Sequence, residues 1–406
     1  MTARPVVAWT VIVAMLAVVA AGVVGVVSAG SPPQQPAPTV TGTEADAQAL
    51  AGAVERAWGD GDRDGFLRLA APTDASQAAA ADTWRALTLL DVDELNLRVL
   101  GLSDQGSAQV QVTWAEAGWR STASSELAMS VADCAEPQQL CLVGIAPSPG
   151  RPAPAWALAP LTVRSTASGA SVVALGGQTI PRDIVATVER AAVAVSARTQ
   201  APEGCARVVI GASAADVAGL VGRADDGTLP AAVASTVDGS SSRQTPAQVV
   251  LDGEVLGQLT PLGREVLLTH ELVHVMTGAA GAALPLWLAE GYADAVALDA
   301  ADVPAKVAAG NVPALVRREG APARLPSAED FAEATAQGSD VAYILSWVAV
   351  RTLQQQIGWS ATNRVHQAAV DGQSLSAALR AEDGPTVAGL TSAWRAELVR
   401  LSRAAG

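Results

Sequence analysis

Residues 263–278 read GREVLLTHELVHVMTG, and residues 284–294 read LPLWLAEGYAD. The first stretch has no internal helix breaker before its final glycine, so it predicts one helix that ends there. Residues four apart lie one above the other on a helix face, with Cβ atoms about 5–6 Å apart. The imidazoles of His270 and His274 can therefore reach one tetrahedral metal ion, and Glu271 would address the open coordination position.

A third ligand is expected on the second stretch, which also predicts a helix. Glu290 follows His274 by 16 residues, and Asp294 lies one helical turn further on the same face. The chain has only three histidines, and two of them lie in this pattern. The alternative is a pair of histidines satisfied inside a buried helix without a metal. That alternative is disfavoured because two imidazoles and a carboxylate are costly to desolvate side by side without a partner.

These two stretches resemble the gluzincin superfamily of zinc metallopeptidases, and in particular the bacterial peptidase-MA-like group. That group shares a His-Glu-x-x-His helix followed by a Trp-Leu-x-Glu-Gly-x-Ala helix, and the resemblance covers residues 178–402. It implies one Zn²⁺ per chain, with His270, His274 and Glu290 as ligands. In thermolysin-like gluzincins an Asp one turn after the ligand Glu supports a ligand His, and Asp294 matches that position.

Three further residues have alternatives that the sequence leaves open. Related families place a Tyr downstream of the Glu ligand to stabilise the oxyanion, which makes Tyr343 a catalytic candidate beside Glu271; the alternative is an aromatic that packs at a helix start. Tyr292 is expected to pack beside Glu290, and His366 is expected at the surface of a polar-looking helix. The interval between the second His and the Glu is shorter than in thermolysin-like and aminopeptidase families, so no specificity is assigned.

The composition limits the classes of partner. At 406 residues the chain is long enough for two domains, and half of its residues are apolar, so large cores can form. The formal net charge of −14 is spread along the chain and would repel phosphate backbones. We therefore expect no nucleic acid partner, and a peptide or protein substrate instead.

The N-terminus has the composition of a membrane segment. Arg4 precedes a mostly apolar, uncharged run from Pro5 to Val27, and roughly 20 apolar residues suffice to cross a bilayer. We expect residues 1–30 to form a transmembrane signal-anchor, which would make this a single-pass protein of the cell membrane with its catalytic domain extracytoplasmic. Residues 27–29 (VSA) also resemble a signal-peptide cleavage site, and cleavage would give a secreted protein.

Between this segment and the metal-binding pattern the chain divides into a first domain and two linkers. Residues 31–43 are expected to form a Pro-rich linker, residues 44–163 an α+β domain, and residues 164–177 a second linker. The motif AWGDGD at residues 57–62, followed by alternating strand patterns, resembles the start of the NTF2-like cone fold. Residues 134 and 141 are cysteines that could form a disulfide or remain two buried thiols.

The expected fold class is therefore α+β: an N-terminal transmembrane helix, a small α+β domain that is possibly NTF2-like, and a mostly helical zincin-like metallopeptidase domain with a small β-sheet over residues 178–402. The expected function is hydrolysis of peptide bonds by zinc-activated water, with Glu271 as the general base. The alternative is a catalytically inactive, membrane-tethered binding or scaffold protein with a peptidase-like fold.

Overall fold

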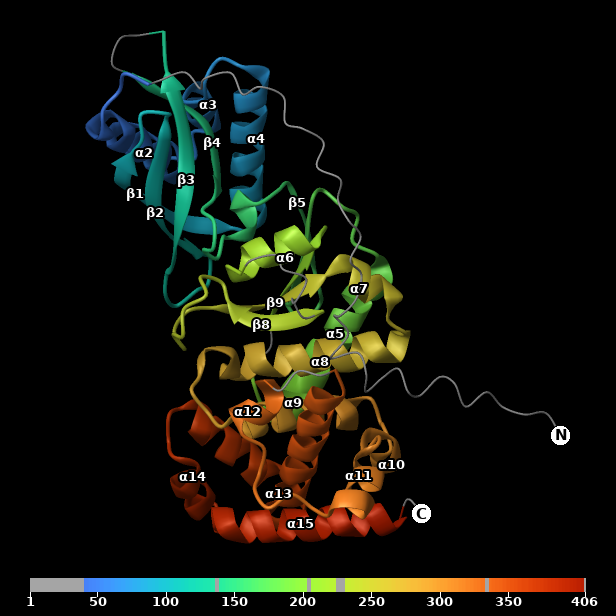
Figure 1. The fold of residues 1–406 in the computed structure, drawn as a ribbon. Helices are drawn as coiled ribbons and strands as arrows, with labels where there is room; N and C mark the ends of the chain where they lie inside the picture. Colours follow the sequence, from blue (N-terminus) through green and yellow to red (C-terminus); the bar gives the residue numbers. More distant parts are fainter. Residues whose placement is uncertain (1–39, 136–138, 203–205, 224–230, 333–335, 405–406) are drawn as a thin grey trace, which may run out of the picture.

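The computed structural model describes residues 40–404 apart from 136–138, 203–205, 224–230 and 333–335. The described part is an α+β fold with two separate sheets (Figure 1). An antiparallel sheet with its helices forms one end of the molecule, a mixed sheet lies in the middle, and a layer of helices forms the other end. The candidate metal ligands lie in this helical layer, on the helices next to the mixed sheet.

The first domain contains a four-stranded antiparallel sheet whose strands follow one another in chain order. Its helices begin at side chains that accept backbone N–H groups, and the first helix has a full capping box between Thr43 and Asp46. Strand β3 alternates buried and half-buried residues, as a sheet covered on one face requires. The elements are α2 (Glu44–Gly59), α3 (Arg63–Arg68), α4 (Asp74–Leu89), β1 (Val92–Leu102), β2 (Ser107–Glu116), β3 (Ala123–Asp133) and β4 (Leu140–Pro147).

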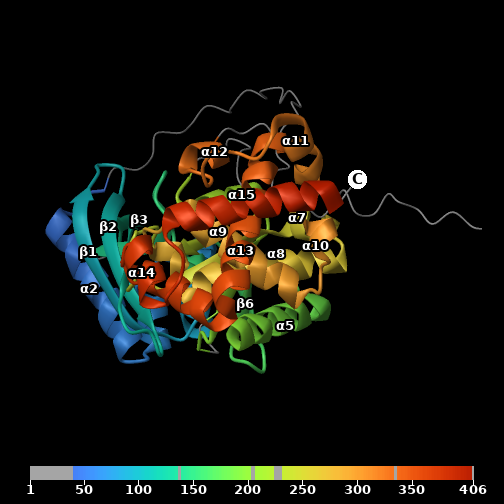
Figure 2. The same cartoon turned by 90° about the horizontal axis from the view of Figure 1, so that it is seen from below.

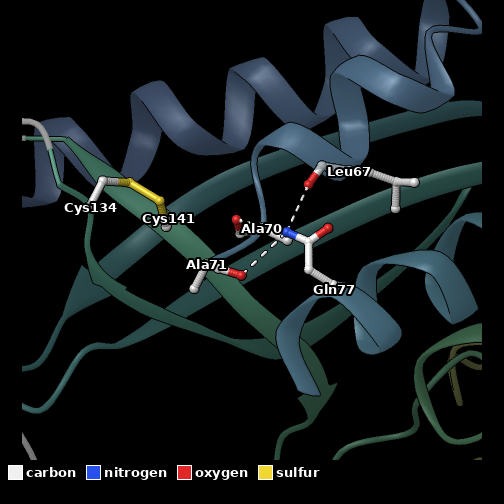
Figure 3. Close-up of a disulfide and its surroundings, with 6 residues drawn as sticks. All are labelled: Leu67, Ala70, Ala71, Gln77, Cys134 and Cys141. Atoms are coloured by element: carbon white, nitrogen blue, oxygen red, sulfur yellow. Dashed lines mark hydrogen bonds between the residues drawn. A yellow bond between two sulfur atoms is a disulfide. The ribbon is translucent and has the colours of Figure 1, made fainter. Parts of the chain in front are cut away.

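A disulfide joins Cys134 and Cys141 across the connection between β3 and β4 (Figure 3). Of the two alternatives that the sequence left open, the structure has the disulfide and not two separate thiols. Nearby, the Gln77 side chain on α4 donates to the carbonyls of Leu67 and Ala71. The disulfide holds the ends of the two strands together, and the glutamine holds the turn after α3 against α4.

The middle sheet has five strands in the order β5-β6-β7-β9-β8. Strands β6, β7 and β9 are parallel, whereas β5 and β8 run antiparallel to their neighbours at the two edges. Residues 164–177, which the sequence predicts to be a linker, form most of the β5–β6 hairpin of this sheet instead. The elements are η3 (Ala155–Ala157), β5 (Leu161–Ser165), β6 (Ser171–Leu175), α5 (Arg182–Thr199), β7 (Arg207–Gly211), α6 (Ala214–Val221), β8 (Ala232–Thr236), β9 (Ala247–Asp252) and α7 (Gly253–Gln258).

Both faces of this sheet are buried, each in a different hydrophobic core. Val208 of β7 and Val249 of β9 face the core that contains α5 and residues of helices α8 (Pro261–Thr277) and α9 (Leu286–Ala300). Their neighbours Val209 and Val250 face the core of the first domain, as the two-residue period of a strand requires. The first domain is therefore packed against the sheet through a continuous core, without a flexible spacer between them.

A buried ion pair adds to this contact. Arg207 at the start of β7 binds both carboxylate oxygens of Glu116 at the end of β2. The guanidinium also lies 5.9 Å from the ring centroid of Trp119. Burial raises the pKa of Glu116 despite the opposing effect of Arg207. Removing either partner would leave a buried charge unpaired, so this pair helps to fix the register between the two sheets.

The helical layer follows the middle sheet. Helix α9 lies between α8 and α13 and packs on both, and α15 lies across the side of the layer that is furthest from the sheet (Figures 1 and 2). Helix α13 contains a kink at Gly358, which has a positive φ of 79°. The elements are α8 (Pro261–Thr277), η4 (Ala279–Gly281), α9 (Leu286–Ala300), α10 (Ala305–Ala308), α11 (Val312–Glu319), α12 (Ala328–Ala332), α13 (Ala336–Val370), α14 (Leu375–Ala381) and α15 (Val387–Ala404).

The predicted transmembrane helix requires a correction. The signal-anchor expected over residues 1–30 lies outside the described residues, as does most of the Pro-rich linker. Among the helices that the structure does describe, none combines the length and the apolar composition needed to cross a bilayer. The α+β fold class is therefore stated without a membrane-spanning element, and the single-pass cell-membrane localisation expected from the sequence is not supported.

Candidate metal centre

Helix α8 begins and ends where local sequence chemistry dictates. The Thr260 hydroxyl accepts the N–H of Gly263, and Pro261 occupies the first turn, where its missing N–H costs nothing. The helix ends at Gly278, whose φ of 77° is the left-handed conformation that glycine adopts without strain. The predicted helix end is confirmed. Every residue from Leu267 to Thr277 is buried, so the two histidines lie in the interior.

Helix α9 brings a carboxylate to these histidines. The Nε2 atom of His270 lies 3.2 Å from Nε2 of His274 and 3.2 Å from a carboxylate oxygen of Glu290. The same oxygen lies 3.5 Å from Nε2 of His274. In the described part of the chain this is the group of His, Cys, Asp and Glu side chains whose donor atoms are close enough to hold one ion.

The spacing of the three donor atoms matches a tetrahedral zinc site. Ligands that lie about 2.0–2.2 Å from a tetrahedral ion lie roughly 3.3–3.6 Å from one another. Of the three separations, 3.5 Å lies within that range, and the two of 3.2 Å lie about 0.1 Å below it. Two imidazoles and one carboxylate are also the donor set of catalytic zinc sites, which keep a fourth position open. The residues therefore fit a zinc ion both in chemistry and in spacing.

Asp294 determines which nitrogen of His270 is available to a metal. Its carboxylate lies 2.8 Å from Nδ1 of His270, in the position expected from the sequence. A carboxylate only accepts, so Nδ1 carries a proton, and Nε2 is the nitrogen that faces Glu290 and His274 and could bind a metal. In the metal-free chain a proton on an imidazole offsets the charge of Glu290, and a bound cation would take that place.

The electrostatics of the donors agree with this arrangement. Burial alone would lower the pKa of His270, but the charge and hydrogen bond of Asp294, with Glu290 and Glu271 nearby, raise it well above its ordinary value. Burial opposes ionisation of Glu290, yet the charge of His274 and the hydrogen bonds of both imidazoles hold the pKa of Glu290 well below its ordinary value. The site therefore favours positive charge at its centre and an ionised carboxylate beside it.

Glu271 is a residue of α8, and its carboxylate lies against the edge strand β8. Its side chain is buried, and its carboxylate accepts a hydrogen bond from the backbone N–H of Ala234. Burial raises the pKa of Glu271, and the charge of Glu290 adds to the rise. A carboxylate whose pKa is raised toward neutrality is a stronger base, which suits proton transfer at physiological pH. The contact with β8 was not expected from the sequence, because it depends on how a distant strand packs on α8.

Tyr343, the candidate for oxyanion stabilisation, lies near the centre. Its ring centroid is 6.4 Å from that of His270, and Phe331 packs edge-on against it at 5.1 Å. The side chain is half-buried on α13. This position is compatible with both alternatives that the sequence left open. The ring packs against Phe331 of α12, as a packing aromatic would, and it lies near His270, as a catalytic tyrosine would.

His366 is buried, contrary to the surface position expected from the sequence. It is 1 % exposed, and its ring is stacked on Tyr292 with centroids 3.8 Å apart and planes inclined by 12°. Its helix looked polar because of Asn363 and Arg364, but the positions four residues before and after His366, Thr362 and Val370, are buried. That repeat of buried positions at helical spacing was the signal that could have placed His366 inside.

No protein-family model matches this chain, and no curated protein is significantly similar to it in sequence. The class of site is therefore defined by its own chemistry: two imidazoles and a carboxylate that converge on one point, with a buried glutamate beside them.

Proposed function

We propose that this chain is a zinc-dependent hydrolase that cleaves peptide bonds in a peptide or protein substrate. The observation that carries the proposal is the convergence of His270, His274 and Glu290 at the donor spacing of a tetrahedral ion, with Glu271 on the same helix. A purely structural zinc site has four protein ligands and needs no base. Three donors together with a buried base support catalysis.

The residues divide the chemistry among them. A zinc ion held at these donors would lower the pKa of water toward about 7 and polarise the scissile carbonyl. Glu271 takes a proton from the attacking water and delivers it to the leaving amine as the peptide bond breaks. Asp294 keeps the proton of His270 on Nδ1 and so keeps Nε2 available as a ligand.

Tyr343 is proposed to stabilise the oxyanion that develops on the carbonyl oxygen. A phenol that donates to developing negative charge contributes mainly to the transition state, so its loss lowers kcat more than it raises KM. In Tyr343→Phe we expect kcat to fall by roughly 10²-fold or more while zinc affinity is kept. An unchanged kcat would leave Tyr343 with a packing role only.

The general base is tested with Glu271→Gln. This change keeps the size and polarity of the side chain but removes its basicity, and Glu271 is not a ligand in the proposal. Zinc content, measured by elemental analysis of the purified full chain, should stay near one per chain. Cleavage of a quenched fluorescent peptide library should disappear. Cleavage that survives this change would contradict the assigned role.

A second measurement tests the class of protein as a whole. The wild-type chain is loaded with Zn²⁺ and assayed on the same library, with His270→Ala as the matched control that lacks one ligand. Turnover that requires both zinc and His270 supports the hydrolase. Bound zinc without turnover on any peptide would favour the scaffold alternative instead.

A further inference from the structure

The chain concentrates its rare polar aromatic residues around the candidate metal centre. It has three histidines and two tyrosines in 406 residues. His270 and His274 are proposed ligands, and the ring of Tyr343 lies 6.4 Å from that of His270. The remaining two, Tyr292 and His366, are stacked on each other behind the ligand helix α9. The role of this second pair is not explained by the proposed chemistry.

The stacked pair belongs to a buried polar chain that joins three helices. The hydroxyl of Tyr292 on α9 donates to the side-chain oxygen of Asn363 on α13 at 2.9 Å. The amide nitrogen of Asn363 donates to the backbone carbonyl of Arg198 near the end of α5 at 2.5 Å. The Nε2 atom of His366, also on α13, is buried with no hydrogen-bond partner in the described part of the chain. Polar groups are rarely buried in this way without a functional reason.

The position of Tyr292 on α9 relates this chain to the ligands. Successive residues of a helix are rotated by about 100° around its axis. Tyr292 is therefore about 200° from Glu290 around the helix and contacts α13, whereas Glu290 and Asp294 are only about 40° apart and contact the histidines of α8. The hydrogen bond and the stack hold the back of the helix whose front carries the carboxylates.

We propose that Tyr292, Asn363 and His366 are positioning residues, which fix the rotation of α9 so that Glu290 and Asp294 meet the histidines of α8. The inference rests on the proposed metal centre and extends it to residues that touch neither metal nor substrate.

A metal site needs its ligand atoms to be placed precisely, so residues that fix the rotation of α9 would support metal binding. The side chains of a helix reach about 5–6 Å from its axis, so a rotation of α9 by about 10° moves a carboxylate by about 1 Å. Metal–ligand distances tolerate only about 0.2 Å. Gly291 lets α9 approach α13 closely, because a Cβ at that position would lie 2.3 Å from the carbonyl oxygen of Ser346. Close packing fixes the distance between the helices, and the polar chain fixes the rotation.

His366 also keeps the surroundings of the ligands free of positive charge. Burial, with the nearby charge of His274, lowers the pKa of His366 to about 3. The ring is therefore neutral at physiological pH and does not repel a divalent cation.

The inference is tested by metal binding rather than by activity. Tyr292→Phe keeps the stacked ring and removes only the hydroxyl, and His366→Leu fills the buried space but removes the stacked ring. The matched control is Thr352→Val, which removes another buried hydroxyl of α13 that bonds only to the backbone carbonyl of Val348. Zinc affinity of the full chain is measured by competition with a chromogenic chelator, and the geometry is read from the visible absorption spectrum of the Co²⁺-substituted protein.

We expect Tyr292→Phe and His366→Leu each to weaken zinc binding by about 10-fold or more and to change the Co²⁺ spectrum, because loss of residues that support the ligands has this effect at metal sites. Thr352→Val should leave both unchanged even if it lowers the melting temperature. Wild-type affinity and spectrum in Tyr292→Phe would overturn the inference, and so would equal losses in the control. If the wild type binds zinc but cleaves no peptide, the proposed hydrolase is refuted and the positioning role is not. If the wild type binds no metal, both proposals are refuted.

Discussion

The buried imidazole of His366 makes a quantitative prediction about acid stability. In the folded chain the pKa of His366 is about 3, against 6.5 for the free side chain, because burial disfavours the charged form. The groups that face it are His274 and the stacked Tyr292, and neither offers a negative charge. Replacing it with Phe keeps an aromatic ring in the stack and removes the titration.

The sign and size follow from proton linkage. Between pH 6.5 and pH 3 the unfolded chain binds a proton at this histidine and the folded chain does not, so stability is lost as the pH falls through that window. Between pH 7 and pH 5 the loss is about 2 kcal/mol, and it reaches about 4 kcal/mol near pH 3. The value at pH 5 hardly depends on the folded pKa as long as that pKa lies below about 4.

The assay is urea unfolding of the full chain at several pH values between 7 and 5, with a chelator present so that metal binding does not contribute. All other titratable groups are present in both the wild type and His366→Phe, so most of their contribution cancels in the difference between the two proteins. We expect the wild type to lose about 2 kcal/mol more than the variant over this range. The larger ring of Phe can shift the variant by a constant of about 1–3 kcal/mol, which does not affect the slope. Parallel curves would refute the burial of a neutral imidazole at this position.

Three further predictions concern the two ligand helices. Asp294→Ala removes the carboxylate that holds the tautomer of its partner histidine, so zinc affinity measured by chelator competition should fall about 10–100-fold; an unchanged affinity would contradict the supporting role. Burial raises the pKa of Glu271 in the metal-free chain, so its carboxylate should titrate above 4.5 when the carbon-13-labelled chain is followed by NMR with a chelator present; a midpoint at or below 4.5 would contradict the raised pKa. Gly291→Ala places a Cβ 2.3 Å from the carbonyl oxygen of Ser346 and should lower the free energy of unfolding by about 3 kcal/mol. In the matched control Gly257→Ala, where nothing lies within 4 Å of the added Cβ, stability should be equal or slightly higher, and equal losses in the two variants would refute the packing argument.

The sequence alone predicts those parts of the fold that depend on nearby residues. The end of α8 follows from Gly278, because a left-handed residue after an apolar helix terminates it at one position. Helix α5 (Arg182–Thr199) is another such element, since its buried apolar residues repeat at helical spacing along the sequence. The expected meeting of Glu290 with the two histidines is also local in origin, because a short connection between consecutive helices leaves few ways to pack them.

The parts that sequence reasoning misses depend on distant partners. Strands β5 and β6 lie in a stretch rich in Ser, Thr, Ala and Gly that was expected to be a linker, and they become strands because β6 pairs with β7. His366 was expected outside because its immediate neighbours are polar. In each case the deciding contact comes from another part of the chain, which local composition does not reveal.

The sequence Glu290–Asp294 shows how one helical turn can satisfy three neighbours at once. Glu290 and Asp294 face α8, where one lies near both imidazoles and the other holds the far nitrogen of His270. Gly291 presents no side chain to α13, so the two helices can approach closely. Tyr292 lies on another side of α9, where its ring stacks on His366 and its hydroxyl donates to Asn363. Every substitution in this turn therefore changes a contact with a different element, and a change on the back of α9 reaches the ligands through the rotation of the helix. That is why we expect metal affinity, which depends on tenths of an ångström, to report on Tyr292 before stability does.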